Sequence, residues 1–201
     1  MAGLSRKATC FISRGSGEDA QLLVFFRFAG AEPECPGGTI EDGETFEAGA
    51  RRDAFEETKL PELTLIGELG ARTYELGREG WSLLCRDARL RNDPRPDAPV
   101  SGRLRANWHV GVLASTAGWS RVVCEGIEGW LRDDDLYERQ ERRFYHFRVP
   151  ADSPDRWRVL ENRTTEIELF WLPLAPRPRL VESNQRWLDE FYDALVEGVK
   201  P

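Results

Sequence analysis

Residues 38–60 read GTIEDGETFEAGARRDAFEETKL, and this stretch decides the fold of the 201-residue chain. It holds seven acidic and three basic residues, so it carries −4 of the net charge of −7. The segment 45–58 has the length of a helix, with Thr45 as its N-cap and Glu47 in its first turn. The acidity of the chain is therefore concentrated on one expected helix and on the loop that precedes it.

At 100° per residue, four charged residues lie within an arc of about 140° around the helix axis and so share one face. They are Arg52, Asp53, Glu56 and Glu57. Like charges three or four residues apart destabilise a helix by a few tenths of a kcal/mol for each pair, so the cluster needs compensation. Divalent cations together with one arginine would supply it. Oxygen ligands suit Mg²⁺ or Mn²⁺, which can share the phosphates of a substrate. An acidic helix face exposed to solvent is the alternative interpretation.

The spacing of these residues favours the metal site. From Gly38 five residues lead to Glu44, and seven more lead to Arg52. After the arginine come an acidic residue, an apolar residue, one further residue, and then Glu56 and Glu57. This pattern resembles the Nudix box, whose family form is G-x5-E-x7-R-E-U-x-E-E-x-G-U, with U apolar.

Two positions depart from the family form. Asp53 stands where the family has a glutamate, so its carboxylate would sit about 1.5 Å further from its target, the length of one C–C bond. Positioning errors of that order matter in catalysis. Lys59 stands where the family has a glycine, so the helix must end without glycine in the left-handed position.

The resemblance implies an α+β protein with the Nudix fold, an α/β/α sandwich built on a mixed β-sheet, in a single domain over 1–201. Apolar runs typical of strands lie at 21–28, 63–73, 80–85, 108–113, 143–149 and 167–172. The stretch 86–105 contains three prolines and many charges, so we expect a loop or insertion there. We expect a short helix over 126–140 and a C-terminal helix with an apolar stripe over 183–199.

The resemblance also implies an activity. Nudix enzymes hydrolyse a nucleoside diphosphate linked to another moiety, by in-line attack of water assisted by a divalent cation. By positional match, Glu56 and Glu57 would be the first ligands of Mg²⁺, or of Mn²⁺. Asp53 would be a further ligand or a weak base, and the backbone of Gly37 would border the metal. Arg52 would pair with a glutamate of the box and orient it.

Contacts with the substrate, a small-molecule nucleotide, are expected around the same loop. The backbone of Gly38 would border the phosphates, and Glu44 would be the partner of the arginine or an outer metal ligand. Arg27 either points from its strand toward the phosphates or is a surface arginine. In some family members the general base lies outside the box, and the candidates here are Glu161, Glu166 and Glu168.

Composition argues against several other classes of function. Charged residues make up 31% of the chain, no apolar stretch has the length of a membrane helix, and the N-terminus lacks a signal-peptide core. We therefore expect a cytoplasmic protein with no membrane partner. The negative charge disfavours broad nucleic-acid binding. Two histidines and four widely spaced cysteines do not form a zinc site. Nudix proteins often dimerise, so a homodimer is possible.

Two alternatives to a hydrolase stay open at this point. The first is a catalytically degenerate Nudix module that binds a nucleotide or a protein without turnover, an interpretation prompted by Asp53 and Lys59. The second is an acidic interaction domain unrelated to the family. The sequence does not select a substrate among nucleoside triphosphates, dinucleoside polyphosphates and nucleotide sugars.

Overall fold

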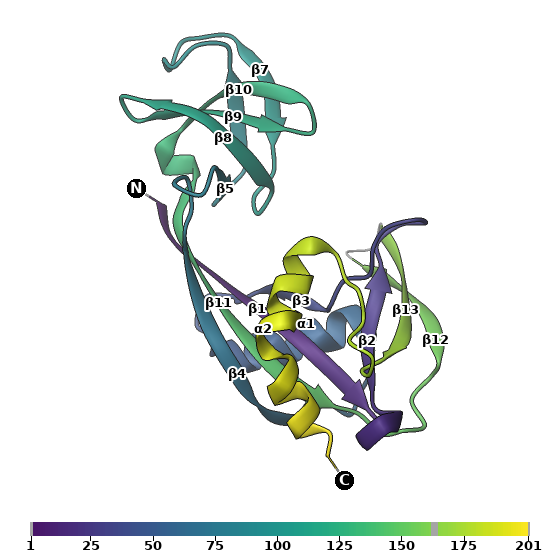
Figure 1. Ribbon diagram of the computed structural model, residues 1–201. Helices are drawn as coiled ribbons and strands as arrows, with labels where there is room; N and C mark the ends of the chain where they lie inside the picture. Colours follow the sequence, from purple (N-terminus) through teal and green to yellow (C-terminus); the bar gives the residue numbers. More distant parts are fainter. Residues whose placement is uncertain (1, 162–164, 201) are drawn as a thin grey trace. The chain divides into compact units, whose positions relative to one another are not determined.

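The chain folds as two compact units in the computed structural model, which describes residues 2–161 and 165–200. The sandwich unit comprises Lys7–Ala71 and Arg142–Pro201, and the strand unit comprises Met1–Arg6 and Arg72–Glu141. Most of the strand unit is thus inserted, along the sequence, between the two halves of the sandwich unit. The single domain expected over 1–201 stays a prediction. Figure 1 draws the elements of both units.

Three long strands have residues in both units: β1 (Ala2–Arg14), β4 (Thr64–Glu75) and β11 (Tyr137–Arg148). The remaining elements of the sandwich unit are β2 (Gln21–Phe26), β3 (Gly37–Thr39), α1 (Phe46–Thr58), β12 (Arg156–Glu161), β13 (Thr165–Pro173) and α2 (Glu182–Gly198), with a short 3₁₀ turn at Gly17–Asp19. The sheet has the order β12-β13-β2-β1-β11-β4, and β3 pairs with β1. Helix α1 and the C-terminal helix α2 both lie where the sequence predicts a helix.

The sheet is mixed because β1 and β11 run in the same direction. Three side-chain hydrogen bonds join them, between Arg142 and Thr9, His146 and Ser13, and Arg148 and Gly15. In all three the partners are 133 residues apart, and a constant separation requires parallel strands. β1 pairs antiparallel with β2 and β3. The expected α+β class with a mixed sheet is therefore confirmed.

Two helices cover the two faces of this sheet (Figure 1). Because side chains alternate between the faces of a strand, neighbouring residues of one strand enter different cores. On the side of α1, Ala8, Cys10, Ile12, Leu23 and Phe25 pack with Ala50 and Ala54. On the side of α2, Phe11, Leu22, Val24 and Phe144 pack with Leu188, Phe191 and Leu195. The unit is thus an α/β/α sandwich. Among the described residues, neither helix is long and apolar enough to cross a membrane.

The strand unit contains a six-stranded sheet with the order β5-β8-β9-β10-β6-β7. Its strands are β5 (Trp81–Leu83), β6 (Ala88–Arg91), β7 (Val100–Leu104), β8 (His109–Thr116), β9 (Trp119–Cys124) and β10 (Ile127–Arg132), followed by a 3₁₀ turn at Asp133–Asp135. Leu90, Val122 and Leu131 belong to its separate apolar core. The stretch 86–105, expected as a loop or insertion, contributes β6 and β7 to this sheet.

The helix expected over 126–140 is wrong, because this segment forms β10, the second 3₁₀ turn and the start of β11. Glu125 and Gly126 have φ values of 49° and 80°, and Ile127 pairs with Cys124. Two central residues with positive φ make the tight turn that suits a β-hairpin. The chain therefore reverses at Glu125-Gly126 and continues as a strand.

The buried His146 makes the stability of the fold depend on pH. Burial, reinforced by the positive charge of Arg148, lowers the pKa of His146 to about 4 from an ordinary 6.5. Between these values the unfolded chain binds a proton that the folded chain does not, so the free energy of unfolding falls as the pH drops. Between pH 7 and pH 5 we expect the free energy of unfolding to fall by about 2 kcal/mol less in His146→Gln than in the wild type.

Urea unfolding at the two pH values measures this difference. Equal losses for the wild type and for His146→Gln would contradict the prediction.

Candidate active site

Helix α1 is fixed at both ends by local interactions. The Oγ1 atom of Thr45, the N-cap, accepts a hydrogen bond from the amide of Ala48 at 3.1 Å. At the other end Lys59 adopts a left-handed conformation with φ 59°, and its amide donates to the carbonyl of Phe55. Lysine therefore takes the conformation that the family form gives to glycine. A defined start and end hold the charged face of the helix in register with the loop before it.

Arg52 is the centre of the charged cluster. Its Nε and Nη2 atoms donate to the two carboxylate oxygens of Glu44 at 2.8 and 2.9 Å. Its Nη1 atom donates to Asp53 at 2.6 Å and lies 3.4 Å from an oxygen of Glu56. The hydrogen bond with Glu44 raises the pKa of Arg52 above its already high range. The guanidinium also donates to the carbonyl of Thr39 at 3.0 Å, so it connects the helix to β3.

Asp53 is buried against the backbone of Gly38. Its side chain has an unpartnered oxygen, Oδ2, while Oδ1 accepts from Arg52. A Cβ atom at position 38 would lie 2.4 Å from Cγ and from Oδ2 of Asp53, so the close approach requires glycine. Burial raises the pKa of Asp53 to about 6, although the charge of Arg52 opposes this rise.

The two glutamates of the cluster have different surroundings. An oxygen of Glu57 accepts the amide N–H of Gly37 at 2.8 Å, which ties the end of the helix to β3. The side chain of Glu56 is 58% exposed. Glu57 thus contacts Gly37 directly, whereas Glu56 is joined to the cluster through Arg52.

Lys7 is a neighbour of the cluster that the sequence interpretation missed. It lies on β1, where it pairs with Thr39, next to the pairing of Ala8 with Gly38. Burial and the positive charge of Arg142 lower the pKa of Lys7 to about 8, whereas the negative charges of Asp53 and Glu57 act in the opposite sense. No motif could reveal this neighbour, because only the β1–β3 pairing brings Lys7 to residues more than thirty positions away.

Other predicted residues have partners elsewhere. Arg27 pairs with Glu34 at 3.3 Å, and its guanidinium lies over the ring of Phe25. Glu166 pairs with Arg158, and Glu168 pairs with Arg156. Both alternate along β13 with Ile167 and Leu169, which pack on the side of α1. Their side chains therefore belong to the opposite face of the sheet. The side chain of Glu161 lies outside the described part of the chain.

The donor atoms fit a hard divalent cation better than they fit any other metal. The acidic residues offer only oxygen, and an unpartnered buried carboxylate oxygen gains a partner when a cation binds beside it. That atom is Oδ2 of Asp53, and Glu57 and Glu56 follow on the same helix face. Within the described residues, no three histidine, cysteine or acidic side chains already converge as a metal site. Arg52 instead supplies the positive charge between these carboxylates.

Two family models match the chain. The model described as NUDIX domain matches residues 3–107, just over half of the chain, and includes α1. The model described as Bacterial SH3 domain matches residues 86–137, which lie within the strand unit. A comparison with curated proteins finds no match.

Several solved structures are similar over nearly the whole chain. A mutT/nudix family protein from Listeria innocua is 18% identical, with 96% of this chain and 94% of that chain covered and a TM-score of 0.43. The Ap4A hydrolase of C. elegans is 11% identical, with 97% and 95% covered and a TM-score of 0.40. The NUDIX domain of Shewanella oneidensis NrtR, complexed with ADP ribose, is 11% identical, with 97% and 90% covered and a TM-score of 0.42. None of these TM-scores reaches 0.5, so the family assignment rests on the match over 3–107 alone.

The contact between Gly38 and Asp53 yields a test of the site geometry. In Gly38→Ala the new Cβ would overlap the carboxylate of Asp53, so we expect the free energy of unfolding to fall by about 1–3 kcal/mol. Gly67→Ala on β4 is the control, because a Cβ there meets no atom within 4 Å and the change should stay within about 0.5 kcal/mol. Urea unfolding of both variants checks this, and equal effects would refute the described contact.

Proposed function

On the premise that this chain belongs to the Nudix family, we propose that it is a Mg²⁺-dependent pyrophosphohydrolase, with Mn²⁺ as a possible substitute. Its substrate would be a nucleoside diphosphate linked to another moiety. The observation that carries the proposal is the pairing of a buried, half-partnered Asp53 with Arg52 beside Gly38. A carboxylate kept buried with an open oxygen costs stability, and a bound cation would offset that cost.

The cation would be held by Asp53, Glu56 and Glu57, with the backbone carbonyl of Gly37 at its border. When bound, a divalent cation neutralises phosphate charge, activates water and stabilises the leaving oxygen. Asp53 would offer Oδ2 while it keeps Oδ1 on Arg52. Glu57 is restrained by its hydrogen bond from the amide of Gly37, so its carboxylate needs little reorganisation on binding.

Arg52 would act as a positioning residue. Its bidentate contact with Glu44 fixes the guanidinium, which leaves Nη1 to orient Asp53 and Glu56. Asp53, whose oxygen Oδ2 has no hydrogen-bond partner, is our choice for the general base if it does not ligate the cation. Glu161, Glu166 and Glu168 stay alternative candidates for that role.

A degenerate binding module is the second candidate function. It is favoured by the shorter acid at position 53 and by the lack of three converging ligands among the described residues. Such a module would be stabilised by a nucleotide without forming product. A homodimer and a cytoplasmic location stay predictions, and a small-molecule nucleotide is the expected partner in both candidate functions.

Glu57→Gln tests the proposed activity. We expect the wild type to release phosphate or a nucleotide from at least one member of a panel of nucleoside triphosphates, dinucleoside polyphosphates, nucleotide sugars and ADP-ribose, in the presence of Mg²⁺ or Mn²⁺. Loss of the negative charge at position 57 should lower kcat by about 100-fold or more. The exposed Glu62 provides the matched control, since Glu62→Gln should leave kcat unchanged.

Two results would contradict this proposal. Turnover of no panel member with either metal, together with thermal stabilisation by a nucleotide, would support the degenerate module instead. Near wild-type kcat in Glu57→Gln would exclude Glu57 as a metal ligand.

Two variants of Asp53 separate the effect of the side chain's charge from the effect of its length. They are Asp53→Glu and Asp53→Asn. Glutamate restores the family form and extends the carboxylate by about 1.5 Å, so we expect kcat/KM to be kept or raised. Asparagine can still accept the hydrogen bond from Arg52 but loses the negative charge, so we expect a higher metal concentration for half-maximal rate. Metal titrations of both variants measure these effects, and an unchanged metal requirement in Asp53→Asn would rule out its role as a ligand.

A further inference from the structure

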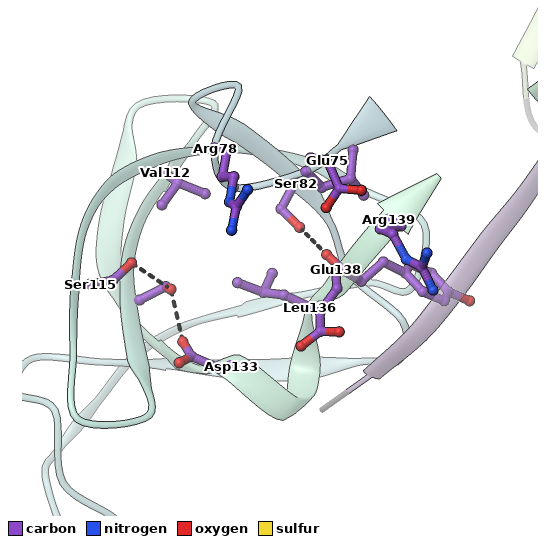
Figure 2. A pocket seen from close by; sticks show the side chains of 13 residues that line it. Glu75, Arg78, Ser82, Val112, Ser115, Asp133, Leu136, Glu138 and Arg139 are labelled. Carbon is purple, nitrogen blue, oxygen red and sulfur yellow. Dashed lines mark hydrogen bonds between the residues drawn. The ribbon is translucent and has the colours of Figure 1, made fainter. Parts of the chain in front are cut away.

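The strand unit contains a pocket of its own, whose lining includes no residue of the proposed hydrolase site (Figure 2). Its volume is about 630 Å³, within the range of about 300–1,000 Å³ that is typical of small-molecule sites. All the residues that line it belong to Arg72–Glu141, including the end of β4, the loop before β5, and the start of β11. The pocket is therefore a property of the strand unit alone.

Charges of both signs line this pocket without neutralising one another. Among the described residues, the side chains of Glu75, Arg78, Glu138 and Arg139 make no hydrogen bond or ion pair. Elsewhere in the same unit, by contrast, arginines do pair with acids, as Arg86 does with Asp135 at 2.7 Å. A ligand that carries both a positive and a negative group could pair with both kinds of lining charge.

A chain of hydroxyl groups marks one side of the pocket. Oγ of Ser115 lies 3.3 Å from Oγ of Ser120, which donates to Oδ1 of Asp133 at 2.8 Å. The hydrogen bond from a mostly buried serine fixes the orientation of the Asp133 carboxylate. Figure 2 shows Arg78 extending from the other side toward the interior, with Leu136 between Arg78 and Asp133.

An apolar part of the lining is formed by aliphatic side chains. Leu76 and Leu136 are buried, and Val112 packs against the core of the strand unit. Tyr137 also belongs to the lining, so the surface that suits short aliphatic groups is the part formed by Leu76, Val112 and Leu136. The volume leaves room for more than a single small amino acid.

We propose that this pocket binds a zwitterionic dipeptide with small aliphatic side chains. Arg78 would bind the terminal carboxylate through its planar guanidinium. Asp133, oriented by Ser120, would bind the terminal ammonium, and Glu138 adds negative charge to the pocket. The aliphatic side chains would contact Val112 and Leu136.

Isothermal titration calorimetry on the full chain tests this proposal with L-alanyl-L-alanine as the probe. The wild type should bind it at least 10-fold more tightly than it binds the amide, the N-acetyl derivative or free alanine. Arg78→Met should weaken binding of the dipeptide by at least 10-fold and leave binding of the amide unaffected. Asp133→Asn, which still accepts the hydrogen bond from Ser120, should weaken binding of the dipeptide by at least 10-fold and leave binding of the N-acetyl derivative unaffected. Arg89→Met is the matched control, because Arg89 is exposed on β6 and does not line the pocket.

Each contrary outcome overturns a defined part of the proposal. Failure of the wild type to bind the dipeptide at millimolar concentration, or equal binding of the doubly capped dipeptide, would exclude a zwitterion site. Equal binding of free alanine would exclude a dipeptide as the occupant. Equal losses in Arg89→Met and Arg78→Met would remove Arg78 from the site. None of these results depends on pyrophosphohydrolase activity, which is measured separately.

Discussion

The hydrogen bonds of the Arg52 guanidinium are the interactions on which the geometry of the candidate site depends. The guanidinium is bound by both oxygens of Glu44, reaches Asp53 and Glu56, and donates to the backbone of β3. Without it, the carboxylates of Glu44, Asp53 and Glu56 would repel one another at the start and along one side of the helix. The guanidinium of Arg52 thus sets the charge balance of α1 and the distance of the helix from the loop before it.

The part of the site that sequence could predict is the part that is local. The spacing from Gly38 to Glu57 places its residues on one loop and one helix, whose geometry is regular enough to calculate. The cap at Thr45 and the apolar stripe of α2 are local in the same sense. The face of β13 that carries Glu166 was not predictable in this way, because strand register decides it.

The rest depended on long-range pairing or on weak turn signals. Lys7 approaches the cluster only through the pairing of β1 with β3. In the strand unit, the turns at Ala117-Gly118 and Glu125-Gly126 have positive φ at both residues, and the glycine in each turn was the available sequence signal for two hairpins. Alanine and glutamate are unusual at such positions, and the strands beside them are short. The charged, proline-containing stretch 86–105 therefore resembled a loop although it forms two strands.

The parallel pairing of β1 with β11, at a constant separation of 133 residues, has a consequence for folding. β11 leaves the ribosome long after β1, so the centre of the sandwich cannot close early in synthesis. In the strand unit between them, β8 with β9, β9 with β10 and β6 with β7 pair as neighbours along the chain, and such local pairings form faster than distant ones. Once folded, the strand unit replaces a long flexible segment by a compact one and lowers the entropy lost when the sandwich closes. Early formation of the inserted unit would thus help the surrounding unit to close.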